Sequence, residues 1–202
     1  PTMSNSEIQS RLKYLETAKS GESLFRQGQR DASRIAYTEA SQYMPRAWKP
    51  YFRIGQIWQG QNNLPEANKY FRMALKFNPD YSPALSMLGN NLKRMGYADE
   101  AEKMLRAAIR SWPMNKYAYD SLAHVLATQD RRPEAIEMLK KAVSIDPKYG
   151  VGHANLAMIY SSLNNNKKSL KHLNRAIQLG VQGPVIDRIK SIVTQKADQE
   201  SR

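Results

Sequence analysis

The chain has 202 residues, enough for one or two ordinary domains or for a single elongated array. Hydrophobic residues make up 41% of the sequence, which excludes a disordered chain, and the absence of cysteine excludes disulfides and thiolate metal sites. The 31 basic and 18 acidic residues give a formal net charge of +13, which favours anionic partners. No run approaches 18 consecutive apolar residues, so no transmembrane helix is predicted.

The first segment, residues 1–13, is predicted to extend the first helix backwards. Ser6 to Lys13 reads as the added helical turns, with Ser4 or Ser6 as the N-cap. The segment Pro1 to Ser10 lacks the basic-then-apolar plan of a secretory signal.

A repeat of 34 residues organises the chain after this extension. Its most visible marker is a proline that recurs at that spacing at Pro45, Pro79, Pro113 and Pro147. In the last unit Val181 takes the place of the proline. The prolines define five units: 14–47, 48–81, 82–115, 116–149 and 150–183. The twenty-seventh place of every unit is alanine: Ala40, Ala74, Ala108, Ala142 and Ala176.

Spacing within a unit predicts two helices joined by a tight turn. Apolar or small residues at places 4, 7, 8 and 11 form one face of the first helix, and those at 20, 24 and 27 form a face of the second. Small residues at places 8 and 20 let the two backbones approach. The proline ends the second helix. The fifteenth place carries residue types that tolerate a left-handed backbone: Gly28, Asn62, Gly96, Asp130 and Asn164.

Residues 184–202 are predicted to form a capping helix, over residues 184–198, and a tail. Pro184 suits a first helical position, and an apolar stripe follows at Ile186, Ile189 and Val193. The charged residues of this helix are expected to face water: Asp187, Arg188, Lys190 and Lys196.

The second unit carries the most specific pattern, Tyr51-x2-Ile54-Gly55-x2-Trp58, followed by Ala67-x3-Phe71, Ala74 and Pro79. This pattern resembles the tetratricopeptide repeat family, and the resemblance covers residues 14–183. One unit cannot bury its apolar face alone, whereas stacked units can. The expected fold is therefore all-α, a right-handed α-solenoid of five helix-turn-helix repeats plus a C-terminal capping helix. The family resemblance implies protein–protein interaction.

The sequence does not read as that of an enzyme. It contains neither a G-x-x-x-x-G-K-[ST] nor a G-x-S-x-G motif. Gly150 and Gly152 lack the preceding strand and third glycine of a dinucleotide loop. The three histidines, His124, His153 and His172, fall in three different predicted helices, and His153 reads as a packing residue. We predict no catalytic residue, no cofactor and no metal site.

Places 2, 6, 9 and 13 lie on the side of the first helix opposite its buried face. In the tetratricopeptide family this side lines a concave groove that takes an extended peptide or a partner's helix. The predicted peptide-binding residues on it are Lys19, Arg26, Lys49, Arg53, Gln56, Met87, Asn90, Arg94, Tyr117, His124, Asn155 and Met158.

The chemistry of these side chains predicts an acidic ligand. The five cations of the set are expected to meet acidic residues, and the three amides to hold the ligand's backbone. Tyr117 and the two methionines would supply adaptable apolar contact. The alternative is that these are solvated polar residues on a surface with no ligand.

A second basic surface lies on the predicted outer helices. It consists of Lys69, Arg72, Lys103, Arg106 and Lys171. A solvated outer face is the favoured reading. The alternative is docking on nucleic acid, anionic lipid or an acidic protein, although few aromatic residues and no recognised motif support nucleic acid.

The leading hypothesis is a scaffold or adaptor that captures a protein partner, acting in the cytoplasm as a monomer or weak homo-oligomer. A second is an envelope assembly factor for a pilus or secretion system, of the tetratricopeptide lipoprotein kind. That would place the chain in the periplasm, with an upstream signal or lipobox removed. A third is binding of nucleic acid or another anionic surface through the outer helices.

Overall fold

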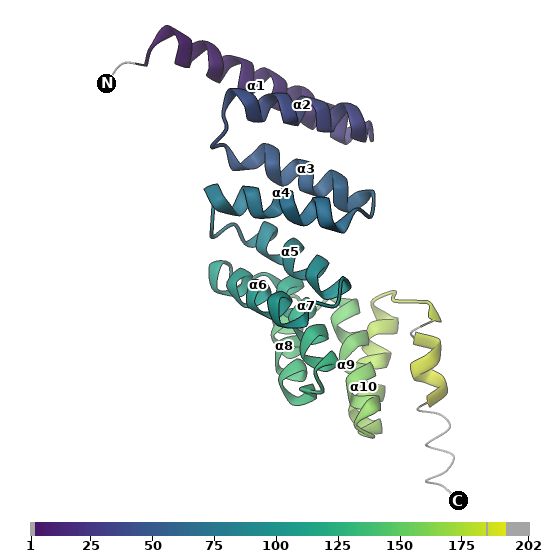
Figure 1. Cartoon of the computed structure of the whole chain (residues 1–202). Coiled ribbons are helices and arrows are strands. Elements are labelled where there is room, and N and C mark those ends of the chain that lie inside the picture. Colours follow the sequence, from purple (N-terminus) through teal and green to yellow (C-terminus); the bar gives the residue numbers. More distant parts are fainter. Residues whose placement is uncertain (1–2, 185, 193–202) are drawn as a thin grey trace, which may run out of the picture. The chain divides into compact units, whose positions relative to one another are not determined.

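The computed structural model describes residues 3–184 and 186–192 (Figure 1). Every regular element in this part of the chain is an α-helix, which confirms the predicted all-α fold. None of the described helices is both long enough and apolar enough to span a bilayer. The backbone divides into two compact units, and the boundary between Tyr97 and Ala98 falls inside the third predicted repeat.

Unit 1 contains five helices, each packed against the next along the chain. They are α1 (Asn5–Arg26), α2 (Arg30–Tyr43), α3 (Trp48–Gly60), α4 (Leu64–Phe77) and α5 (Ser82–Arg94). The most extensive contacts are those within the pairs α1–α2 and α3–α4. These are the two-helix modules that the repeat predicts.

Unit 2 continues the same order. Its helices are α6 (Ala98–Ser111), α7 (Lys116–Thr128), α8 (Arg132–Ile145), α9 (Gly150–Ser162) and α10 (Asn166–Gln178). Here α7 pairs with α8 and α9 with α10. A further helical segment follows at residues 184 and 186–192.

Helix ends repeat with the period of the sequence. The first helices α3, α5, α7 and α9 all begin at the first place of their repeat and end at the thirteenth. The second helices α2, α4, α6 and α8 all end two residues before the recurring proline. The prediction that the proline ends the second helix is confirmed, because it has no N–H to donate and disfavours a helical residue before it.

The turn inside each pair uses a left-handed residue, as predicted. Backbone φ is 75° at Gly28, 61° at Asn62, 87° at Gly96, 62° at Asp130 and 56° at Asn164. Such a residue reverses the chain in few residues, so the second helix can return along the first. Glycine adopts this conformation without strain, and asparagine and aspartate tolerate it.

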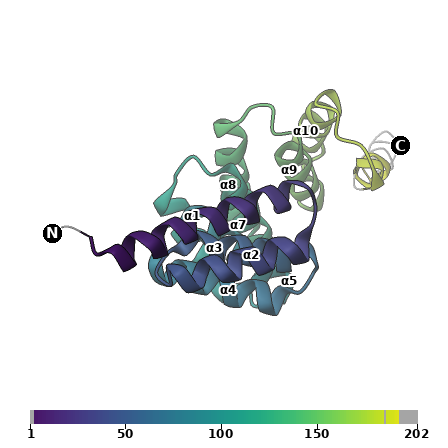
Figure 2. The ribbon, with the colours of Figure 1, turned by 90° about the horizontal axis from the view of Figure 1, so that it is seen from above.

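Helix α1 has 22 residues against 14 in α2, so its amino-terminal turns run on past the end of its partner (Figures 1 and 2). A capping box starts the helix at Ser4. The Ser4 backbone N–H donates to the Glu7 carboxylate at 2.7 Å, and the Glu7 N–H donates to Ser4 Oγ at 3.3 Å. Ser4, and not Ser6, is therefore the N-cap.

Close packing within pairs depends on the small residues at places 8 and 20. A methyl group added at Gly55 would lie 2.7 Å from the ring of Phe71, and one at Gly21 would lie 3.1 Å from the ring of Tyr37. The hydroxyl of Ser33 donates to the Gly21 carbonyl at 2.8 Å across the α1–α2 pair. The backbones of each pair can therefore approach closely.

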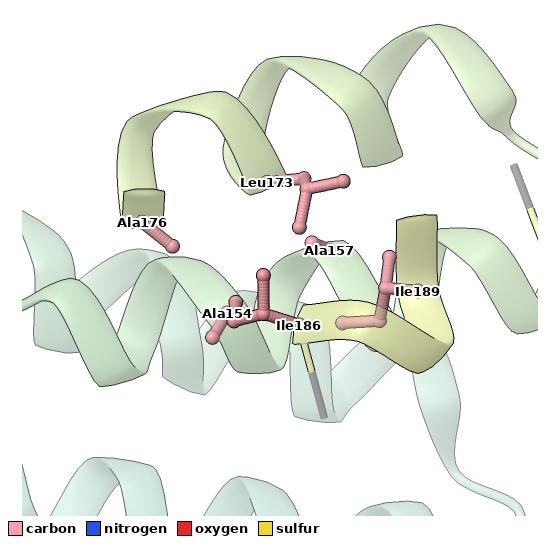
Figure 3. Packing of buried hydrophobic residues seen from close by; sticks show 6 residues of the cluster. All are labelled: Ala154, Ala157, Leu173, Ala176, Ile186 and Ile189. Carbon is pink, nitrogen blue, oxygen red and sulfur yellow. The ribbon is translucent and has the colours of Figure 1, made fainter. Parts of the chain in front are cut away.

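The end of unit 2 is covered by the C-terminal segment (Figure 3). Ile186 and Ile189 are each 2% exposed and join a cluster with Ala154, Ala157, Leu173 and Ala176. Asp187, Arg188 and Lys190 are exposed. The predicted capping helix is thus present, and Val193 and Lys196 lie outside the described residues.

Candidate functional site

All twelve predicted peptide-binding residues are exposed or half-buried, and all lie on first helices. In unit 1, α1 carries Lys19 and Arg26, α3 carries Lys49, Arg53 and Gln56, and α5 carries Met87, Asn90 and Arg94. In unit 2, α7 carries Tyr117 and His124, and α9 carries Asn155 and Met158. The units are described separately, and in each of them a pocket is bordered by some of these residues.

In unit 1 the carboxylate of Glu22 interacts with three side chains. The Tyr37 hydroxyl donates to it at 2.9 Å, Arg53 Nη2 lies 2.9 Å away, and Arg26 Nε lies 3.3 Å away. Partial burial acts to raise the pKa of Glu22, but the hydrogen bond from Tyr37 and the charge of Arg53 outweigh it, and the pKa is lowered. Glu22 therefore stays ionised and holds Arg53 in place.

A pocket of about 320 Å³ lies beside this ion pair. Half of the residues that line it are aromatic, and three are charged. The lining residues are Tyr14, Ala18, Glu22, Tyr37, Trp48, Lys49, Pro50, Phe52, Arg53 and Tyr81.

The aromatic wall of the pocket is internally packed. The Trp48 and Tyr81 ring centroids are 4.2 Å apart, and Phe52 meets Tyr81 edge to face at 4.9 Å. Lys49 is exposed, with its Nζ 5.7 Å from the Trp48 ring. Burial raises the pKa of Tyr81, so its hydroxyl stays neutral. The pocket can accept an apolar or aromatic side chain with an anionic group beside Lys49.

The aromatic wall was not among the residues predicted from the sequence. Trp48, Phe52 and Tyr81 occupy places 1, 5 and 34, whereas the prediction used places 2, 6, 9 and 13. The signal that could have revealed them is compositional, because the repeat 48–81 is the one repeat with aromatic residues at all three places.

Unit 2 has a smaller pocket of about 230 Å³ between α7, α8 and α9. Its floor is apolar and its rim polar, with three predicted residues among those that line it. The lining residues are Asp120, Ala123, His124, Ala127, Thr128, Leu139, Asn155, Met158 and Ile159. An aliphatic side chain is the group that such a cavity fits.

Two of the three predicted amides, Gln56 and Asn155, already have partners within the chain. Asn155 Nδ2 donates to Asp120 Oδ1 at 2.7 Å, which ties α9 to α7. Gln56 Oε1 accepts from Arg53 Nη1 at 2.9 Å, and Gln56 Nε2 lies 3.9 Å from Met87 Sδ. Each of these groups would have to keep or exchange its partner when a ligand backbone binds.

The remaining predicted residues lie outside both pockets. Lys19 is exposed on α1, and Arg94 Nη2 donates to Asn62 Oδ1 at 2.6 Å. Tyr117 is 61% exposed, and its ring meets that of Tyr149 edge to face at 5.8 Å.

The basic residues on the outer helices, which are the second helices of the repeats, differ in whether a carboxylate pairs with them. Lys69 pairs with Glu66 at 3.4 Å, and Arg106 pairs with Glu102 at 2.7 Å. Lys103 and Lys171 are exposed. Arg72 is also exposed, and no acidic residue occurs anywhere in α10. The positive charge of α4 and α6 is therefore partly neutralised, whereas α10 has no acidic residue of its own to do this.

Two of the three histidines meet across the α9–α10 pair. Nδ1 of His153 and Nδ1 of His172 are 3.0 Å apart, and the His172 ring also stacks on Tyr160. His124 lies apart on α7. Within the described residues no cluster of three or more side chains suited to a metal ion occurs.

The fold and these surfaces define an α-helical repeat protein. The family model of the tetratricopeptide repeat matches residues 19–82, 86–150 and 152–179, and the chain belongs to this family. Its members are generally interaction scaffolds without catalytic activity, and this fold supports a protein-interaction scaffold. A comparison with curated proteins gives no match.

Several solved structures share the fold. PilF of Pseudomonas aeruginosa matches with a TM-score of 0.83 at 13% identity, covering 96% of this chain and 88% of PilF. MamA of Desulfovibrio magneticus matches at 0.75 and 19% identity, covering 89% and 97%. YrrB, described as a TPR protein with an unusual peptide-binding site, matches at 0.72 and 19% identity, covering 87% and 90%.

Proposed function

We propose that this scaffold binds a partner protein through the first-helix side of unit 1. The bound segment is extended and acidic, and it places one apolar or aromatic side chain in the pocket walled by Trp48, Phe52 and Tyr81. The observation that carries the proposal is this pocket, where an aromatic wall and two basic side chains lie together.

The aromatic wall would supply most of the binding energy. Trp and Tyr in concave, desolvated positions are the residues on which protein recognition most often depends. Trp48 and Tyr81 are the first and last residues of the second repeat, and Tyr14 and Glu22 of the first repeat line the same pocket. An anchor side chain would therefore contact two repeats at once.

The charges would select an acidic segment. Arg53 is compensated by Glu22, but Lys49 has no carboxylate among its described contacts. Lys19 adds a second exposed cation on α1. An acidic residue next to the anchor would gain from Lys49, whereas a basic one would be repelled.

Unit 2 would take an aliphatic side chain of a partner in its own pocket. Met158 lines this pocket and is 42% exposed, and a flexible thioether adapts to different apolar partners. The hydrogen bond between Asn155 and Asp120 holds the polar rim in place.

The test uses four fluorescein-labelled decapeptides: acidic with a central Trp, acidic without it, basic with a central Trp, and neutral with a central Trp. Fluorescence anisotropy of the full chain measures binding of each. We expect the acidic Trp peptide to bind most tightly and Trp48→Ala to weaken it at least tenfold.

Lys49→Glu should weaken the acidic Trp peptide about fivefold, because an attraction becomes a repulsion. Lys103→Glu is the matched control, since it makes the same charge change on the outer surface of α6 and should leave binding unchanged. Equal affinity for all four peptides, or equal loss with both variants, would count against the proposal.

A further inference from the structure

An apolar stripe is exposed on the amino-terminal half of α1. Ile8 is 41% exposed, Leu12 54% and Leu15 55%, although all three are large aliphatic residues. Their spacing of four and then three residues places them on one side of the helix. The side of α1 that packs into unit 1 is a different one, because Tyr14 and Gly21 there are less exposed.

The stripe lies on the side of α1 that also carries Lys19, four residues after Leu15. In the C-terminal segment a comparable pair of aliphatic residues, Ile186 and Ile189, is buried against α9 and α10. No described residue covers Leu12 or Leu15 to a comparable extent.

The spacing is that of a coiled-coil seam. Ile8, Leu12 and Leu15 fit successive d, a and d positions of a heptad, where apolar residues of two helices interlock. In this register Arg11 is a g position and Glu16 the e position five residues later. In a parallel pair of identical helices, g of one copy meets the following e of the other, so each Arg11 faces a Glu16.

The charges of Arg11 and Glu16 are free to pair across this contact, and they favour a parallel over an antiparallel arrangement of the two helices. Neither Arg11 nor Glu16 has a described ion pair within the chain. An antiparallel pair would bring like positions together, g to g and e to e, with no attraction between Arg11 and Glu16. The alternation of charge therefore matches a parallel second copy.

We infer that the exposed stripe of α1 is a self-association surface on which a second copy of this chain forms a short parallel coiled coil. The contact is isologous, with the same residues on both copies. Three aliphatic side chains per copy bury far less than the roughly 1,200 Å² of a stable interface. The dimer is weak, with a dissociation constant on the order of 100 µM.

Sedimentation equilibrium of the full chain from 5 to 500 µM tests the inference. The wild type should show a monomer–dimer equilibrium, and Leu12→Ser should weaken it at least tenfold. Leu170→Ser is the matched control, because Leu170 is also exposed, at 42%, but lies on α10. A wild type that stays monomeric at 500 µM, or equal loss with both variants, would overturn the inference.

Charge reversal tests the partner and the direction of the helices. Arg11→Glu and Glu16→Arg should each weaken self-association about fivefold. A one-to-one mixture of the two single variants should restore it, because each Glu then faces an Arg in the mixed dimer. The parallel pairing would be overturned if neither charge reversal changed the affinity of self-association. It would also be overturned if the mixture associated no more tightly than either variant alone. Both residues are exposed, and circular dichroism checks that the variants stay folded.

Discussion

At the scale of single residues, the interior of each helix pair depends on how the eighth place of a repeat meets the twenty-fourth. Where the residue at the twenty-fourth place is aromatic, the eighth is glycine, as in Gly21 with Tyr37 and Gly55 with Phe71. In the last pair a leucine, Leu173, lies in one cluster with Ala157. In the first two pairs the ring takes the volume that the methyl group of Ala157 occupies in the last, because protein interiors are close-packed.

Gly55→Ala should destabilise the protein by about 1–3 kcal/mol, since the added methyl would lie 2.7 Å from the fully buried ring of Phe71. Adding Phe71→Leu should recover at least about 1 kcal/mol, because the pair then matches Ala157 and Leu173. Urea unfolding of the two single variants and the double variant measures this coupling. Strictly additive effects would contradict the packing explanation.

The contribution of the pair His153 and His172 to folding stability depends on pH. The pKa of His172 is lowered to about 4, first by burial and then by the charges of His153, Lys171 and Lys140. The pKa of His153 is lowered too, chiefly by burial. Because the unfolded chain binds the proton more readily, the contribution of the neutral pair is fully present above about pH 6.5 and is lost as pH falls toward 4.

His172→Phe should remove this dependence while keeping a ring to stack on Tyr160. We expect the wild type to lose on the order of 1 kcal/mol more than the variant between pH 7 and pH 4.5, because solvent still reaches both histidine rings. Urea unfolding at several pH values gives the comparison, with exposed His124→Gln as control. Parallel profiles for wild type and His172→Phe would refute the assignment.

At the scale of elements, some helices begin at a side-chain cap, and the turn inside a repeat ends the first helix. Asn63 begins α4 by accepting from the Glu66 N–H at 3.3 Å, and Asn165 begins α10 by accepting from the Lys168 N–H at 3.2 Å. The left-handed residue one position earlier, Asn62 or Asn164, ends the preceding helix. Each turn therefore ends one helix and starts the next with a few local groups.

Gly96→Ala tests the turn between α5 and α6 locally. The φ of 87° strains any side chain, although no atom lies within 4 Å of where a methyl would be, so steric packing plays no part. Alanine should cost about 1–2 kcal/mol, and Gly96→Asn less, since Asn62 adopts the same conformation. Thermal unfolding ranks the three proteins, and equal stability of the alanine variant and the wild type would contradict the strain.

At the scale of the whole molecule, stability is expected to be a sum of repeat and neighbour terms. The C-terminal segment supplies the last of these terms through Ile186 and Ile189. Removing their contacts should therefore loosen α9 and α10 without loosening α1 to α4.

Ile186→Ala and Ile189→Ala should each cost about 2–4 kcal/mol of local stability, because both side chains are almost fully buried. Hydrogen exchange read by mass spectrometry locates the effect, and peptides from α9 and α10 should exchange faster. Arg188→Ala, at an exposed position between them, is the control. Uniform acceleration over the whole chain would contradict a nearest-neighbour array.

The architecture could be derived from the sequence because the same residue types recur at the same places in five repeats of 34 residues. Proline, left-handed turn residues and small residues at fixed places act over a few bonds, so their effects can be read without coordinates. The lining of the pockets could not be derived this way. Trp48 and Tyr81 are 33 positions apart and stack only because the α3–α4 pair brings the two ends of its repeat together. Glu22 compensates Arg53 because α1 and α3 pack in successive repeats, and His153 meets His172 because α9 packs on α10. Residue type and spacing therefore determined the helices, their ends and the side that stays exposed, whereas which side chains share a pocket, a charge or a proton was decided by packing between helices.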